Sequence, residues 1–446
     1  MAILLKNAKI INEGQITQKD ILIEGNFIAK IDGNIAHPSA KTFDLSGKYI
    51  LPGIIDDQVH FREPGLTHKA NIYTEARAAV AGGITSFMEM PNVNPPSVTQ
   101  ELLEQKYQIA AATSLANYSF FMGTTNENIE EVLRTNPEDV CGVKIFMGSS
   151  TGNMLVDNEK ILRSLFSQVP MLIAAHCEDE AIIRANLSAF KERYGENVPA
   201  SMHPIIRNRE ACYKSSSFAI ALAKEYGTRF HVLHISTAEE CGLFSNDIPL
   251  ADKRITAEAC VHHLSFQKED YARLGNLIKC NPAIKDRSDK DAILQAVLDN
   301  KIDIIATDHA PHTWEEKAQP YFMSPSGLPL VQHSLQLMLK LYKEGKISLE
   351  KIVEKMCHAP ADCFKVKSRG YIREGYYADI AVLDLDEHVL IQNNKNVLYK
   401  CGWSPLNGME LPGKVTHTFV SGHLAYQHGV FDETVKGMRL KFAAQG

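Results

Sequence analysis

The sequence contains no run of about 20 apolar residues, the length that a membrane-spanning helix needs. Its first residues lack a basic stretch followed by an apolar one and a cleavage site, so we expect a strand there and no signal peptide. The nine cysteines are scattered and form no Cys-x-x-Cys pair. Reduced thiols in a cytoplasmic protein are the expected state of such a chain.

Blocks of like charge are also missing. The 47 Lys and Arg residues and 53 Asp and Glu residues give a net charge of −6 that is spread along the chain. This pattern argues against nucleic acid or a membrane surface as a partner. No short repeat or low-complexity tract is visible, and 45% hydrophobic residues are ordinary for a soluble globular protein.

The two ends of the chain share a pattern of short β-rich runs separated by turn residues. Such runs occur at 3–5, 9–11, 20–23 and 27–31, and again at 378–383 and 416–420. Neither end is long enough for a sandwich of its own. We therefore predict that residues 1–50 and 366–446 pair into one small β-sandwich domain.

Between the ends, apolar strands alternate with amphipathic helices, which is typical of βα units around a parallel sheet. One such helix is expected at 70–81, where Gly82 and Gly83 end it. Eight strands are expected, at 54–59, 85–90, 118–122, 143–146, 171–175, 230–233, 255–259 and 304–306. The chain is thus predicted to be of the α/β class, with a (β/α)₈ TIM-type barrel over residues 51–365.

Metal-binding residue types follow several of these strands. His60, His176, His234 and Asp308 each come at a strand end. In a (β/α)₈ barrel all strand C-termini lie at one mouth, so these side chains are expected to converge. A single histidine after a strand is more often structural, but four such placements favour a metal site. Imidazole and carboxylate suit Zn²⁺.

Lys144 lies inside the fourth predicted strand, in the run GVKIF. A lysine among apolar residues is costly unless its charge is removed or paired. Carbamylation by CO₂ would turn it into a carboxylate able to bridge two ions. A snorkelling or ion-paired lysine is the alternative.

Several short motifs resemble those of the dihydroorotases within the amidohydrolase superfamily. They run in the family's order over about residues 50–330, and the DDQVHFREPG and ATDHAPH stretches are the most specific. The motifs are DDQVHFREPG at 56–65, MPN at 90–92, AHCE at 175–178, LHIS at 233–236, NP at 281–282 and ATDHAPH at 306–312.

The resemblance implies a ligand set for one or two zinc ions. His60 and Asp308 would bind the first ion, His176 and His234 the second, and Lys144 would bridge them as N6-carboxylysine. Some relatives use an aspartate at the end of the fourth strand instead, and the matching position here is Gly148. One departure is serious, because Gln58 stands where the family has the first histidine of His-x-His. Gln58 would be a weak ligand, which leaves the number of ions open.

Substrate contacts are implied in the same way. Arg62 can hold a substrate carboxylate in a two-pronged pair. By resemblance the other substrate contacts would come from His60, Asn92, Asn281, His312, Ser326 and Gly327. For Asn92 and Asn281, both next to proline, an ordinary turn residue is the alternative.

The implied activity is reversible, zinc-dependent hydrolysis of a cyclic amide between dihydroorotate and N-carbamoyl-aspartate, in pyrimidine biosynthesis. Zinc would lower the pKa of a water molecule, and Asp308 would accept its proton and later return it to the leaving nitrogen. A dihydropyrimidinase, hydantoinase or allantoinase, or a scaffold weakened by Gln58, remain alternatives. The expected partner is a small molecule, with a homo-oligomer left open.

Three minor features complete the expectations. The loop at 148–153 suits a lid over the substrate, although a plain turn is nearly as good an interpretation. His262 and His263 are assigned supporting roles near the mouth, and Cys177 a packing role.

Overall fold

The computed structural model describes residues 2–148 and 154–444. Of the segment predicted to form a lid, only Gly148 belongs to the described residues; 149–153 lie outside them. No helix within the described ranges is both long and apolar enough to cross a membrane.

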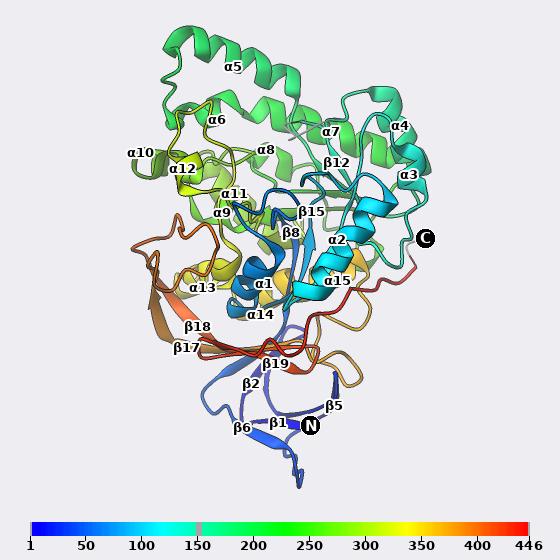
Figure 1. The fold of residues 1–446 in the computed structure, drawn as a ribbon, viewed down its shortest axis with the longest axis vertical. Coiled ribbons are helices and arrows are strands. Elements are labelled where there is room, and N and C mark those ends of the chain that lie inside the picture. Colours follow the sequence, from blue (N-terminus) through cyan, green and yellow to red (C-terminus); the bar gives the residue numbers. More distant parts are fainter. Residues whose placement is uncertain (1, 149–153, 445–446) are drawn as a thin grey trace.

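A parallel barrel forms the centre of the molecule (Figure 1). Hydrogen-bonded neighbours follow the chain order, and the first and last strands meet where Val59 pairs with His309. The (β/α)₈ prediction is confirmed, with each strand within a few residues of its expected place. The strands are β8 (Ile54–Val59), β9 (Ile84–Glu89), β10 (Asn117–Phe120) with β11 (Met122–Gly123), β12 (Val143–Phe146), β13 (Ile173–His176), β14 (Phe230–Val232), β15 (Ile255–Cys260) and β16 (Ile304–Ala306).

Helices between the strands cover the outside of the barrel (Figure 1). The expected helix at 70–81 forms as α1 (Ile72–Ala81), where the Asn71 side chain caps the first turn and Gly82 ends the helix. The other long helices are α2 (Gln100–Thr113), α4 (Glu159–Gln168), α5 (Glu180–Tyr194), α7 (Arg209–Tyr226), α11 (Arg287–Leu298) and α13 (Ser334–Lys343). Except for α5, their apolar faces enter one large core with the barrel strands, whereas Leu187 and Phe190 of α5 pack in a separate small cluster.

Both ends of the chain build a second, all-β part. In one sheet β17 (Ile380–Leu390) pairs antiparallel with β7 (Tyr49–Pro52), which also pairs parallel with β2 (Lys9–Asn12). The remaining strands of this part are β1 (Ile3–Lys6), β3 (Gln15–Gln18), β4 (Asp20–Glu24), β5 (Phe27–Asp32), β6 (Lys41–Asp44), β18 (Glu410–Val420), β19 (His423–Gln427) and β20 (Val430–Phe431). The predicted β sandwich from both termini is confirmed. The boundaries at residues 50 and 365 stay a prediction.

The last described residues leave this β part and lie along the barrel, as the red segment of Figure 1 shows. The Tyr118 N–H donates to the Met438 carbonyl at 3.0 Å, and the Leu440 N–H donates to the Tyr118 carbonyl at 2.9 Å. Phe442 is fully buried against the barrel side. The C-terminal segment therefore ties the two parts of the molecule together.

Candidate metal and substrate site at the barrel mouth

A pocket of about 220 Å³ opens at the C-terminal ends of the barrel strands. Every residue that the sequence predicted for the site lines this pocket, so the structure brings the whole predicted set together. They are Gln58, His60, Arg62, Asn92, Lys144, His176, His234, Asn281, Asp308, His312, Ser326 and Gly327. The volume is that of a small-molecule site.

His60 is oriented by two neighbours. Its Nδ1 lies 2.8 Å from the Asn92 amide oxygen, which accepts its proton and leaves Nε2 for a ligand. Nε2 lies 3.1 Å from Oδ1 of Asp308. Burial raises the pKa of Asp308, but contact with His60 outweighs it, and the pKa lies below its usual value. Asp308 is thus ionised at neutral pH.

His176 and His234 face each other across the mouth. Nδ1 of His176 lies 3.0 Å from Nε2 of His234. Behind His176, Nε2 lies 2.9 Å from a Glu178 oxygen, and Glu178 also forms an ion pair with Arg207. Burial opposes ionisation of Glu178, yet Arg207 and His176 hold its pKa at about 2. A carboxylate behind a histidine is a common support for a metal ligand.

Gln58 turns its amide nitrogen toward the ligand carboxylate. Nε2 donates to Oδ1 of Asp308 at 3.2 Å, while Oε1 faces the Cys260 thiol at 3.6 Å. In this arrangement the Gln58 amide nitrogen supports Asp308, and its role as a weak metal ligand stays a prediction.

The surroundings of Lys144 and Gly148 favour a carbamylated lysine over an aspartate as the bridging ligand. Lys144 is buried, and burial lowers the pKa of its amine to about 7. A large fraction of the amine is then neutral at neutral pH, the form that reacts with CO₂. A side chain at Gly148 would begin 2.3 Å from the Glu178 carbonyl oxygen, which leaves no space for an aspartate.

The donors at the mouth fit a divalent metal ion. Two imidazole nitrogens face each other, and Nδ1 of His234 is buried without a hydrogen-bond partner among the described residues. Imidazole nitrogens and a carboxylate are the ligands that zinc binds in catalytic sites.

Arg62 provides the positive charge of the pocket. Its Nε donates to the Pro311 carbonyl at 3.0 Å, and a terminal nitrogen lies 3.0 Å from Nε2 of His312. Burial lowers the pKa of Arg62 to about 10, so the guanidinium stays charged at neutral pH. Within the described ranges it forms no ion pair with an acidic side chain. Its remaining donors suit a carboxylate on a ligand.

A loop carrying Ser326 and Gly327 closes another side of the pocket. The Gly327 N–H donates to the Lys279 carbonyl, so only part of this loop's backbone is left for a ligand. Lys317 donates to the carbonyls of Pro325 and Gly327, each at 2.9 Å. Position 327 requires glycine, because its φ is +136° and a Cβ would lie 2.5 Å from the Ala310 carbonyl oxygen. The sequence gives no sign of the role of Lys317.

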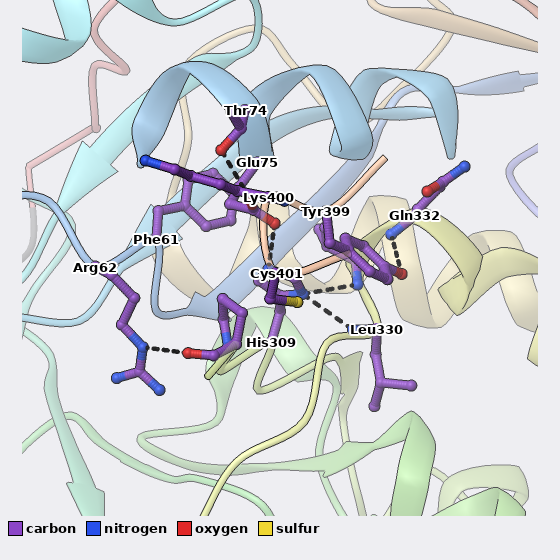
Figure 2. A network of polar contacts seen from close by, with 12 residues as sticks. Phe61, Arg62, Thr74, Glu75, His309, Leu330, Gln332, Tyr399, Lys400 and Cys401 are labelled. Atoms are coloured by element: carbon purple, nitrogen blue, oxygen red, sulfur yellow. Dashed lines mark hydrogen bonds and ion pairs between the residues drawn. The ribbon is translucent and has the colours of Figure 1, made fainter. Parts of the chain in front are cut away.

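A buried network holds the end of the eighth strand (Figure 2). Nε2 of His309 lies 2.9 Å from Glu75, and the backbone N–H of Leu330 donates to Nδ1 of His309. The other Glu75 oxygen accepts the N–H of Lys400. The segment around Tyr399 thus supports the strand end that carries Asp308. His309 lies within the ATDHAPH motif, but only the structure identifies Glu75 as its partner.

The two remaining predictions concern packing. His262 and His263 lie in the short helix α9 (Val261–Ser265), both buried, and Nε2 of His263 lies 3.1 Å from the Pro282 carbonyl oxygen. Neither lines the pocket. Cys177 is buried, and burial raises the pKa of its thiol, as expected of a packing residue.

Three residues of the site have strained backbone. Arg62, His234 and Asp308 have φ angles of 70°, 39° and 47°. Non-glycine residues adopt this region at a cost and tend to do so where a side chain must be aimed. In each case the residue stands just after a barrel strand and turns its side chain into the mouth.

Relatives of known name share the sequence and the fold. Residues 49–425 match the model of the amidohydrolase family. The chain is 32% identical to a dihydroorotase of Bacillus cytotoxicus over 96% of its own length and 99% of that protein. It is 33% identical to a dihydroorotase of Listeria welshimeri, with the same coverage of both chains.

Solved structures share the architecture at lower identity. An L-hydantoinase (dihydropyrimidinase) from Arthrobacter aurescens superposes with a TM-score of 0.91 at 24% identity, covering 98% of this chain and 99% of that one. A dihydropyrimidinase from Brevibacillus agri gives 0.87 at 21%, covering 99% and 100%. These similarities concern the fold, whereas the family model matches most of the chain and the sequence relatives match 96% of it. The protein therefore belongs to the amidohydrolase family.

Proposed function

We propose that this protein is a dihydroorotase, which interconverts dihydroorotate and N-carbamoyl-aspartate in pyrimidine biosynthesis. The observation that carries the proposal is Arg62, a buried guanidinium in the pocket without an acidic partner in the described chain. A cyclic amide that bears a free carboxylate gives this guanidinium a two-pronged partner. Dihydropyrimidines and hydantoins without that carboxylate leave it unpaired. The names of the sequence relatives support the same choice.

His60, His176, His234 and Asp308 would hold the metal, with Lys144 as a carbamylated bridge. When bound, a zinc ion lowers the pKa of a water molecule and polarises a carbonyl. Glu178 and Asn92 orient the imidazoles from behind. Because Gln58 stands where a histidine ligand is expected and directs its amide nitrogen to Asp308, we propose that the first site is the weaker of the two.

Asp308 moves the proton. In ring opening its carboxylate accepts a proton from the attacking water and returns it to the departing ring nitrogen. In ring closure the same oxygens act in the reverse order. Its low pKa keeps it ready as a base, and the Gln58 amide holds Oδ1 in place.

Arg62 and His312 would bind the substrate carboxylate, with Asn281 and Ser326 along the ring edge. The pocket takes a small molecule, and a cytoplasmic site of action is proposed because the nine cysteines are all free thiols.

The test is the steady-state rate of N-carbamoyl-aspartate cyclisation by the purified protein, with and without added zinc. Zinc-dependent turnover is expected, with dihydrouracil a much poorer substrate in the hydrolytic direction. Faster hydrolysis of dihydrouracil would assign the protein to the dihydropyrimidinases. A folded protein without turnover on either compound would favour the alternative that the protein is a scaffold without catalytic activity.

A further inference from the structure

A second cluster of metal-ligating side chains lies inside the barrel. Asp57 on β8, His231 on β14 and Glu258 on β15 are each fully buried. One ligand atom from each lies within 4.8 Å of the others. None of the three lines the pocket at the mouth, so the cluster is separate from the site described above.

The spacing of these atoms suits one small cation. Nε2 of His231 lies 3.5 Å from Oδ2 of Asp57 and 3.4 Å from Oε2 of Glu258. Zinc binds nitrogen and oxygen at about 2.1 Å, and the edge of such a tetrahedron is about 3.4 Å. Both measured separations therefore match two ligands on one ion, and both are too long for good hydrogen bonds.

The residues around the cluster leave one ligand atom of each member available for a cation. Nδ1 of His231 lies 2.8 Å from the Thr256 hydroxyl, which directs Nε2 toward the carboxylates. Oε1 of Glu258 accepts the backbone N–H of His234 at 3.0 Å, which leaves Oε2. No N–H or hydroxyl donor of the described residues reaches either oxygen of Asp57, whose carboxyl group lies beside that of Glu258. One ligand atom from each of the three residues thus faces a common point.

The charges of the buried cluster also require a bound cation or a proton. Two fully buried carboxylates face one imidazole, and no lysine or arginine of the described residues forms an ion pair with either. An uncompensated pair of buried charges costs far more than a folded protein can supply, so a cation or a shared proton must lie between them. A shared proton would join Asp57 and Glu258 alone, whereas a divalent cation would also bind Nε2 of His231, which faces both carboxyl groups.

The geometry points to a structural zinc site formed by Asp57, His231 and Glu258 in the barrel interior. The three residues come from strands of the rigid barrel, and the site is closed to solvent, so the ion would enter as the chain folds. Asp57 adjoins Gln58, and Glu258 holds the backbone of His234. The buried ion would thereby connect β8, β14 and β15, three strands whose ends form the mouth.

Anomalous diffraction at the zinc edge tests the proposal on the unaltered protein. Crystals of protein purified in the presence of zinc should show a peak within bonding distance of Nε2 of His231, Oε2 of Glu258 and the Asp57 carboxylate. Peaks confined to the mouth would overturn the proposal and leave a proton shared by the two carboxyl groups. This readout is independent of activity, so it can fail while the proposed function stands, and the reverse.

Metal content provides a second measurement. The isosteric change Asp57→Asn should remove one equivalent of zinc per chain after dialysis against a chelator, and His231→Gln should do the same. The mouth double variant His176→Asn/His234→Asn is the matched control, and should retain the buried equivalent. Retention of this equivalent in both Asp57→Asn and His231→Gln, with folding verified by circular dichroism, would contradict the site.

Discussion

Arg62 is proposed to bind the substrate carboxylate, because it is buried in the pocket without an acidic partner among the described residues. The change Arg62→Lys keeps the charge but replaces a fork of donors by a single point. A lost charge-assisted hydrogen bond is worth about 1.5–3 kcal/mol, so kcat/KM for dihydroorotate should fall roughly 10- to 100-fold. The loss should appear mainly in KM, because the carboxylate is bound in the ground and transition states alike. Initial rates over a range of dihydroorotate concentrations measure both constants.

The control for this prediction is Arg184→Lys, since Arg184 is a surface residue whose side chain is 68% exposed. Its kinetics should match those of the unaltered protein. An Arg62→Lys variant with unchanged KM would mean that the guanidinium does not touch the substrate.

Asp308 is the one proton carrier that we assign. Asp308→Asn keeps the shape and removes the base, so turnover should fall by at least about 100-fold while substrate binding stays measurable. Stopped-flow turnover and calorimetric titration with dihydroorotate check the two parts. Turnover near the unaltered rate would remove Asp308 from the proposed mechanism.

Lys144 gives a prediction about pH. Carbamylation consumes the neutral amine, and burial places the amine's pKa at about 7. The neutral fraction rises with pH, so reactivation of metal-free, decarbamylated protein by zinc and a fixed CO₂ concentration should speed up from pH 6 to 8 and then level off. Lys144→Met should show no CO₂-dependent reactivation. A pH-independent rate in the unaltered protein would speak against a carbamate.

At the scale of the elements, the loop at 325–327 is held in place by the side chain of Lys317. Lys317, in α12 (Trp314–Lys317), donates to two carbonyls of this loop and to that of Lys279. Lys317→Met should free these carbonyls, raise KM several-fold and leave the fold intact. Faster amide hydrogen exchange at 324–328 is the direct readout.

Lys343→Met serves as the matched control, because Lys343 is exposed at the end of α13. It should change neither exchange nor KM. Unchanged exchange in Lys317→Met would show that the loop is held without the ammonium group.

At the scale of the whole molecule, the C-terminal segment joins the β part to the barrel. Phe442 is fully buried and belongs to the same apolar cluster as Phe121 and Phe364. Phe442→Ala should lower the free energy of unfolding by about 3–5 kcal/mol, the cost of a large core deletion. Urea denaturation followed by circular dichroism measures this loss. Val430→Ala, at a side chain that is 71% exposed, should change it by less than about 0.5 kcal/mol.

The sequence predicted the strands well because their signal is local. Eight apolar runs separated by amphipathic helices are a property of neighbouring residues, and all eight became barrel strands. The meeting of His60, His176, His234 and Asp308 followed as well, because parallel strands of a barrel end at one mouth. The small β sandwich was predictable for a different reason, because neither end of the chain was long enough to form a sandwich alone.

Only the tertiary structure decided the contacts between distant segments. No local sequence pattern predicts these contacts. They are the hydrogen bond from Gln58 to Asp308, the Glu75–His309 pair, the hydrogen bonds from Lys317 to the loop at 325–327, and the buried cluster of Asp57, His231 and Glu258. The register between β8 and β9 shifts beside Asp57, so strand alternation alone would misplace its side chain. Periodicity is set by neighbours along the chain, whereas hydrogen bonds, charge pairing and pKa depend on which segments the closed barrel places side by side.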